Sequence, residues 1–306
     1  MRVTVLAGGT GGTKLAHGFA LLEDAVDLSI AANVGDDTEI HGLVVSPDVD
    51  TLLYTLSGLV DRERGWGIAG DTMSAHAQFE RLGEPTWFTV GDADLATHVH
   101  RTRRLRHGDR LTDVVGDMAV SLGIRARVLP ATDDRHRTIV ETDVGALAFQ
   151  EYFVRLRQQP VVRAVRYDGV GQPTPEVLEA IASADLVVIG PSNPIVSIEP
   201  ILVLPGVREA VAAVRARTVA VSPIVAGRAL KGPADRMLES LGHEVSALGV
   251  ARLYADIVEH FVVDEADADL APRIEEELGL AVEVLPTVMR TDDDRRRLAA
   301  ALVALA

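Results

Sequence analysis

The sequence contains no cysteine, only two lysines and no long apolar run. Without cysteine there can be no disulfide, no thiolate metal ligand and no cysteine nucleophile, so any metal must be bound by oxygen or imidazole. No apolar stretch approaches the ~20 residues that span a bilayer, and Met1 to Ala7 lack the basic and apolar regions of a signal peptide. We therefore expect a cytoplasmic protein without a membrane segment. The lysines, Lys14 and Lys231, stand among 30 Lys and Arg residues, a bias that suggests a GC-rich genome.

An excess of positive charge is missing too. The formal net charge is −15 and the pI is about 5.0. Because nucleic-acid-binding proteins rely on a basic surface to neutralise phosphates, we expect no nucleic-acid partner, although a nucleotide ligand is compatible with this charge. What the chain does have is 306 residues, of which 47% are hydrophobic. These suffice for one large α/β domain with a sizeable core.

Short apolar runs alternate with segments of helical periodicity. Strands are expected at 2–7, 28–33, 125–129, 138–142, 146–149, 161–166, 186–189, 218–221, 261–263 and 282–285, and helices at 15–22, 51–60, 72–82, 233–241, 250–260 and from residues 175 and 292. The alternation predicts an α/β fold with a doubly wound, mainly parallel, Rossmann-like sheet. We expect a single domain over 1–306 with a small inserted α+β lobe at about 125–165. In such sheets, ligands bind where loops leave the carboxyl ends of the strands.

A glycine-rich segment follows the first predicted strand and opens the first predicted helix. It comprises Gly8, Gly9, Thr10, Gly11, Gly12, Thr13 and Lys14. Backbone N–H groups in such a turn can converge on a phosphate, and the helix dipole adds a favourable field. We therefore interpret the segment as a diphosphate cradle, although its spacing matches neither the Rossmann fingerprint nor a Walker loop. The alternative is a tight turn that needs glycine only for its backbone conformation.

An acidic pair, Asp48 and Asp50, follows Pro47 and precedes a predicted helix. Proline favours an extended neighbour, and in an extended segment residues two apart project to the same side. The two carboxylates could then share one Mg²⁺, which favours a few carboxylates together with phosphate oxygens. We take Asp48 and Asp50 as candidate catalytic residues and metal ligands, and expect Asp50→Asn to abolish turnover while leaving the fold intact. Helix capping by Asp50 is an alternative that is compatible with this role.

Polar residues also end several other predicted strands. Asn33 and Asp37 follow the second strand, and Ser192, Asn193 and Ser222 follow two apolar strands later in the chain. We interpret all five as candidate ligand contacts, because the carboxyl edge of the sheet is where ligands bind. For Asn33 and Asp37, an ordinary turn is the alternative.

A second acidic segment contains Asp92 and Asp94, with His98 one helical turn after Asp94. Asp92 and His98 are candidate binding residues, and the alternative is a helix cap beside an exposed histidine. A basic run from Arg101 to Arg106 follows. Such runs usually form a solvated helix face, but this one could instead neutralise an anionic donor.

Taken together, these segments resemble the CofD family, called FbiA in actinobacteria, over nearly the whole chain. The resemblance is carried, in order, by Gly8 to Gly11, Ser46 to Thr51, Trp66 to Ile68, Asp71 with Thr72, Gly91 with Asp92, Ala96 to His98, Leu111 with Thr112, Ile189 to Pro194, Val221 to Ile224, and Gly232 to Ala234. The combination is specific, whereas no single segment is. Members of this family join a phospholactyl or phosphoenolpyruvyl group to the deazaflavin Fo in the synthesis of coenzyme F420.

The resemblance implies an enzyme, a Mg²⁺-dependent transferase of substituted phosphate groups. The terminal ribityl hydroxyl of Fo would attack the acid-side phosphorus of a guanosine diphosphate conjugate of lactate or enolpyruvate and expel GMP. Such transfer depends mainly on positioning and charge neutralisation. By position, the Fo contacts fall on Asp50 and near Thr89, and Ser192, Asn193 and Ser222 would complete the pocket. Related proteins also suggest a homodimer.

A second hypothesis comes from a related branch, the YvcK-like regulators, which bind nucleotide sugars on the same fold without known transfer chemistry. Those proteins typically continue the Asn-Val-x-Asp-Asp segment with Gly-Gly-Ser. This chain continues it with Thr38, Glu39 and Ile40, and the acidic pair follows. The difference favours the enzyme.

Overall fold

The computed structural model describes residues 1–169 and 171–306, and its centre is a seven-stranded sheet in which every neighbouring pair is parallel. The strand order is β14-β13-β10-β9-β1-β2-β5. The strands are β1 Arg2–Ala7, β2 Asp27–Ala32, β5 Arg127–Pro130, β9 Leu186–Ile189, β10 Thr218–Val221, β13 His260–Asp264 and β14 Ala281–Leu285. This arrangement confirms the predicted α/β fold with a doubly wound parallel sheet.

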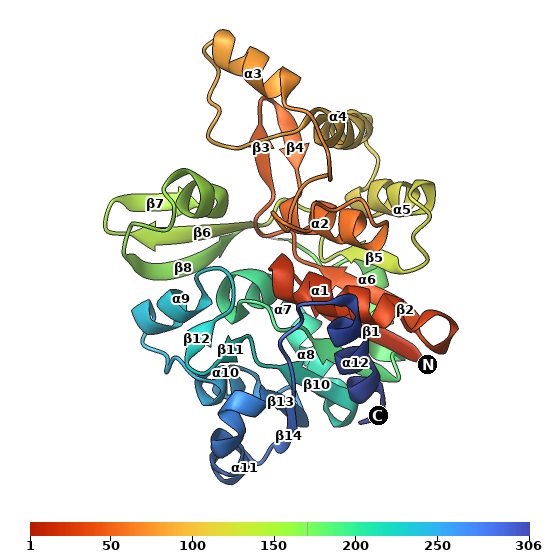
Figure 1. Cartoon of the computed structure of the whole chain (residues 1–306), viewed down its shortest axis with the longest axis vertical. Helices are drawn as coiled ribbons and strands as arrows, with labels where there is room; N and C mark the ends of the chain where they lie inside the picture. Colours follow the sequence, from red (N-terminus) through yellow and green to blue (C-terminus); the bar gives the residue numbers. More distant parts are fainter. Residues whose placement is uncertain (170) are drawn as a thin grey trace.

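Helices cover both faces of the sheet (Figure 1). One face packs against α1 Gly9–Ala20, α2 Pro47–Leu56, α5 Leu111–Ser121 and α12 Asp292–Val303. The other packs against α6 Pro175–Ser183, α7 Glu199–Leu202, α8 Val207–Ala213, α9 Ala234–Ser240, α10 Ala247–Tyr254 and α11 Ala271–Leu278. Successive residues of a strand point to opposite faces of the sheet. In β1, Val5 packs into the hydrophobic core on one face and Leu6 into the core on the other. Because helices cover both faces, a central strand such as β9 is apolar throughout.

The helices that follow β1 and β9 pack on opposite faces, so the winding of the sheet reverses between these two strands. Val3 pairs with Leu186 and Leu6 with Ile189, which brings the ends of both strands to the same edge. Ligands of doubly wound sheets bind in the crevice beyond such a reversal. The fold therefore places the turns after β1 and β9 where sheets of this kind bind their ligands.

Two smaller units project from the main sheet (Figure 1). A hairpin of β3 Thr38–Ile40 and β4 Leu43–Val45 lies beside α4 Asp92–Arg106, with α3 Ser74–Arg81 at its far end. A three-stranded antiparallel sheet contains β6 Arg137–Thr142, β7 Gly145–Ala148 and β8 Val162–Asp168. The π-helix η2 Glu151–Arg155 follows β7, and a second one, η3 Pro194–Ile198, follows β9. Two residues form each strand of a further hairpin, β11 Ile224–Val225 and β12 Arg228–Ala229.

The sequence-based boundaries need several corrections. The strand expected at 125–129 is β5 of the main sheet, and the strand expected at 161–166 is β8 of the antiparallel sheet. The separate sheet therefore spans 137–168 and not about 125–165. Short strands of mixed polarity carry no local sign of the sheet that they join. The helix expected at 250–260 is α10, which starts earlier and leaves His260 to β13. Helix α5 and the β3–β4 hairpin were not predicted.

Candidate active site

A cavity of about 560 Å³ lies at the carboxyl edge of the sheet, at the reversal between β1 and β9. Its walls come from the turns after β1, β2, β9 and β10, from α2, from the segment between β14 and α12, and from the antiparallel lobe. The predicted site residues that line it are Gly8, Gly9, Thr10, Gly11, Lys14, Asp48, Asp50, Thr89, His98, Ser192, Asn193 and Ser222. Gly12, Asn33, Asp37 and Asp92 lie outside this lining. The fold thus brings most of the predicted residues together.

The glycine-rich segment is helical, because α1 begins at Gly9 with Gly8 as its N-cap. The N–H groups of a first helical turn have no acceptor within the helix. Gly9 donates its N–H to Asp48 Oδ1 at 2.7 Å. Thr10 and Gly11 follow in the same turn and line the cavity. The helix dipole and these two N–H groups favour an anion at this position.

Close packing explains why this helix begins with glycines. Ser192, in the turn after β9, accepts the N–H of Gly12 at 3.0 Å and donates its hydroxyl to Gly8 O at 2.6 Å. A Cβ on Gly11 would lie 1.9 Å from Pro191 O, and one on Gly12 would lie 2.5 Å from Ser192 Oγ. Larger side chains would therefore separate α1 from the turn after β9, before any effect on a bound phosphate.

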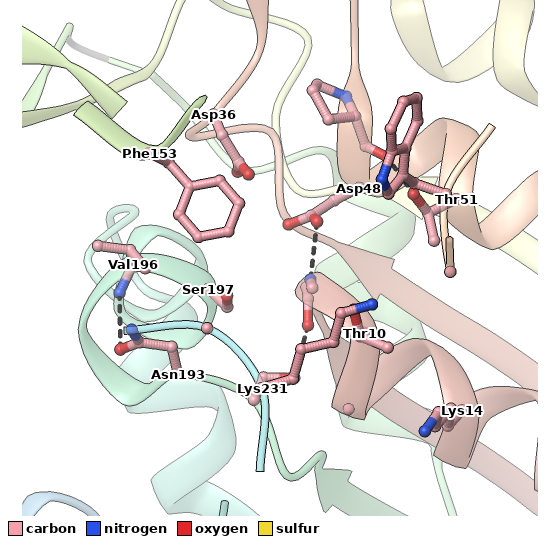
Figure 2. A pocket seen from close by; sticks show the side chains of 18 of the residues that line it. Thr10, Lys14, Asp36, Asp48, Thr51, Phe153, Asn193, Val196, Ser197 and Lys231 are labelled. Atoms are coloured by element: carbon pink, nitrogen blue, oxygen red, sulfur yellow. Dashed lines mark hydrogen bonds between the residues drawn. The ribbon is translucent and has the colours of Figure 1, made fainter. Parts of the chain in front are cut away.

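Two carboxylates, Asp36 and Asp48, meet at one wall of the cavity (Figure 2). Asn33 holds them together: its Nδ2 donates to Asp48 Oδ2 at 2.8 Å and also to Asp36 Oδ1. Burial raises the pKa of Asp36 well above its ordinary value, and the charges of Asp48 and Asp37 raise it further. Burial also raises the pKa of Asp48, against the hydrogen bonds from Asn33 and Gly9. Two buried carboxylates this close repel each other, so the site favours a bound cation.

The extended conformation predicted for Asp48 and Asp50 is wrong. Helix α2 begins at Pro47, and both acids belong to its first turn. Proline restricts the residue before it, here Ser46, and is itself favoured at the first position of a helix. Residues two apart in a helix do not face each other. Asp48 therefore lies beside Asp36, while Asp50 has other partners.

Asp50 forms a buried ion pair with Arg101 in α4. Arg101 Nη1 lies 3.2 Å from Asp50 Oδ2, and Nη2 donates to the other carboxylate oxygen. His98 stands between two acids, with Nδ1 3.6 Å from Asp50 Oδ2 and Nε2 3.5 Å from Asp94 Oδ2. Tyr54 donates its hydroxyl to Asp94 at 2.7 Å. Arg101 therefore fixes Asp50 at the cavity wall, and it is not part of a solvated face.

Asp37 and Asp92, both predicted as binding residues, have partners away from the cavity. Asp37 is buried and accepts a hydrogen bond from Ser46 at 2.9 Å, and burial raises its pKa to about 7. Asp92 accepts the N–H groups of Ser74 at 3.1 Å and Ala75 at 2.8 Å, at the start of α3. The capping alternative holds for Asp92, but the helix that it caps is α3.

The polar residues after β9 and β10 line the cavity while they shape its turns. Asn193 Oδ1 accepts the N–H of Ile195 at 2.9 Å and so begins η3. Ser222 Oγ donates to Ile224 O at 2.9 Å, closing the turn after β10. Their side chains are therefore held in place by the backbone at the edge of the cavity.

Aromatic residues form another part of the wall. Phe149 and Phe153, from the lobe around η2, stack with ring centroids 5.4 Å apart, and Trp66 and Phe88 come from the connections on either side of α3. Sequence reasoning chose none of these four as a site residue, because distant aromatic residues share no local pattern. It also left out Asp36, which its position between Asn33 and Asp37 could have indicated.

Comparison with known proteins shows the family of the chain. The family described as 2-phospho-L-lactate transferase CofD matches residues 3–294. The chain belongs to the CofD family. A 2-phospho-L-lactate transferase of Methanocaldococcus jannaschii is 40% identical over 97% of this chain and 96% of its own length. A phosphoenolpyruvate transferase of Kitasatospora aureofaciens is 40% identical over 100% of this chain and 98% of its own length.

A solved structure shares the fold of this chain. A UPF0052-family protein from Bacillus halodurans has a TM-score of 0.65 and 18% identity, covering 99% of this chain and 98% of that one. This CofD-family chain is accordingly a transferase with the predicted fold, and its membership favours the enzyme over the YvcK-like regulator. In the described part of the chain, no helix has the length and apolar character to cross a membrane.

Proposed function

We propose that this CofD-family protein transfers a 2-phospholactyl or phosphoenolpyruvyl group from a guanosine diphosphate conjugate to Fo, releasing GMP and forming (dehydro) coenzyme F420-0. The observation that carries the proposal is the composition of the cavity. A helix start and two buried carboxylates line it, together with the stacked pair Phe149 and Phe153 and two further aromatic residues, Trp66 and Phe88. The helix start and the carboxylates suit a diphosphate with a divalent cation. The aromatic residues suit a flat deazaflavin ring.

The residues present fit Mg²⁺. Asp36 and Asp48 offer oxygen atoms, which this cation prefers, and their mutual repulsion would be relieved by a positive charge. Among the described residues there is no cluster of three or more acidic or histidine ligands, so phosphate oxygens and water would supply the rest, as Mg²⁺ favours. Bound here, Mg²⁺ would neutralise charge that develops on the diphosphate. We assign the ligands to Asp48 with Asp36, in place of the pair Asp48 and Asp50.

The transfer is a displacement at phosphorus. The terminal hydroxyl oxygen of Fo forms a bond to the acid-side phosphorus, the bond from that phosphorus to the bridging oxygen breaks, and GMP leaves with the electron pair. Thr10 and Gly11 hold the diphosphate through their N–H groups. Asp50, held by Arg101, accepts the hydrogen bond of the attacking hydroxyl and takes its proton. Because the transition state is loose, a weakly basic carboxylate is adequate.

The cytoplasmic location and the homodimer that the sequence suggested stay predictions, as does the choice between lactyl and enolpyruvyl donors. Both donors present the same diphosphate to the start of α1. One relative is named a 2-phospho-L-lactate transferase and the other a phosphoenolpyruvate transferase, so the proposal covers both donors.

The test is to incubate the purified protein with Fo, MgCl₂ and each guanosine donor, and to follow GMP and the F420-0 product by mass spectrometry. We expect both products with at least one donor and neither with EDTA. If Fo and donor are recovered unchanged in the presence of Mg²⁺, the proposal is wrong.

A thermal-shift comparison separates the enzyme from the nucleotide-sugar regulator. Fo and the guanosine donor should each raise the unfolding temperature, because both bind the folded state. Stabilisation by UDP-sugars alone would favour the regulator.

A further inference from the structure

Both lysines of the chain line the same cavity. Lys14 lies in α1, and Lys231 lies in the loop between β12 and α9, so only the fold brings them together. Every other member of the 30 Lys and Arg residues is an arginine. Lysine differs from arginine in carrying a compact charge that approaches an anion at one point. Both lysines of the chain therefore belong to the wall of one cavity.

Neither ammonium group has a carboxylate partner in the described ranges. Lys14 Nζ donates to Met289 O at 3.0 Å, and Lys231 Nζ donates to Arg64 O at 3.2 Å. An ammonium group has three N–H donors, so each lysine keeps donors for a ligand after its bond to a carbonyl. In a chain of net charge −15, two cations without an acidic partner in one cavity indicate an anionic ligand.

The charges around Lys14 also indicate an anionic ligand. Burial lowers the pKa of Lys14, and the positive charges of Arg295 and Lys231 lower it further. The two lysines are therefore close enough to repel each other. An anion bound between the two ammonium groups would offset their repulsion.

The site as proposed above assigns no partner to the carboxylate of the donor's acid group. The start of α1 and the acidic pair account for the diphosphate, with its cation. Lys14 is one helical turn from Thr10, on the same face of α1, and Figure 2 shows the side chain of Lys231 at the start of this helix, beside Thr10. A group that is a few bonds from the acid-side phosphorus would lie near both ammonium groups.

We infer that Lys14 and Lys231 form a subsite for the carboxylate of the transferred acid, an inference that rests on the proposed function. The lactyl and enolpyruvyl groups share this carboxylate, so one subsite serves both. It confines the donor to esters of 2-hydroxy or enol acids. Alkyl or sugar esters of the same diphosphate lack the group that the lysines bind.

The test compares two ligands by isothermal titration calorimetry in MgCl₂: the lactyl conjugate of GDP, and the isopropyl ester of GDP, in which a methyl group replaces the carboxylate. The variants are Lys231→Gln, Lys14→Gln and the charge-matched control Arg228→Gln. Lys231 and Arg228 are both exposed, and Arg228 lies outside the cavity lining. Removal of an exposed charge in this loop should therefore leave the fold intact.

We expect each lysine variant to weaken the lactyl conjugate ~10-fold, the value of one charged hydrogen bond, and to change the affinity for the isopropyl ester by less than about twofold. Arg228→Gln should bind both like the wild type. Equal weakening of both ligands would show that the lysines hold the diphosphate and would overturn the inference, as would no weakening of either.

The outcomes for the wild type separate this inference from the proposed function. A wild type that binds neither ligand contradicts both. A wild type that binds the lactyl conjugate in a lysine-dependent manner, yet transfers nothing to Fo, refutes the proposed reaction and leaves the carboxylate subsite standing.

Discussion

Replacement of Asp50 by asparagine should destabilise the fold as well as stop the reaction. The sequence suggested that the fold would be intact, but the structure shows a buried ion pair with Arg101. Arg101 is 0% exposed and Asp50 is 5% exposed, so water cannot solvate the charge left behind. Removal of one partner of such a pair costs ~3–5 kcal/mol. The amide oxygen of asparagine still accepts one hydrogen bond, so we expect a loss of ~3 kcal/mol.

The size of this loss should depend on pH through Asp37. The charge of Asp37 also stabilises Arg101, and its pKa is about 7. At pH 5.5 Asp37 is protonated and cannot compensate Arg101, whereas at pH 8.5 it is ionised and compensates in part. The cost of Asp50→Asn should therefore be smaller at pH 8.5, by ~1 kcal/mol.

The assay is urea unfolding followed by circular dichroism at both pH values, for the wild type, Asp50→Asn, Arg101→Met and the double variant. Loss of both partners should cost less than the sum of the single losses, because no charge is left uncompensated in the double variant. A loss below about 1 kcal/mol for Asp50→Asn, equal at the two pH values, would refute the reasoning.

Three further variants test other parts of the site. Asp36→Asn removes the repulsion with Asp48, so the protein without Mg²⁺ should gain ~1 kcal/mol at pH 7.5 while turnover falls at least ~10-fold; a less stable variant with normal turnover would contradict this. The folded pKa of Asp37, about 7, lies above the ordinary value of 3.8. The wild type should therefore lose up to ~4 kcal/mol relative to Asp37→Asn between pH 4 and 7, and no more at higher pH; a constant difference in urea unfolding would exclude the raised pKa. Gly11→Ala, whose Cβ would meet Pro191 O at 1.9 Å, should cost ~2 kcal/mol, whereas Gly116→Ala, with open space in α5, should be neutral or stabilising. Equal thermal stability of the two glycine variants would show that α1 does not need this close contact.

The buried strands were the best predicted part of the fold. Runs such as Leu186–Ile189 are apolar throughout because helices cover both faces, and that burial is written into the local sequence. The polar turns at the ends of these strands were also predictable, since parallel strands present their carboxyl ends at one edge. A separate small lobe was expected, but its membership was not predicted correctly: the strand at 125–129 joins the main sheet and the strand at 161–166 joins the lobe, because pairing is a non-local choice.

Sequence alone thus determined the class of fold, the edge of the sheet at which the cavity lies, and a part of the residues that line it. Tertiary structure decided which of those residues act on one another. Asp48 meets Asp36 through Asn33, Asp50 meets a buried arginine, and the two lysines line the same cavity. Burial and hydrophobic period are properties of neighbouring residues in the chain, whereas charges separated by many residues interact only at distances that packing sets.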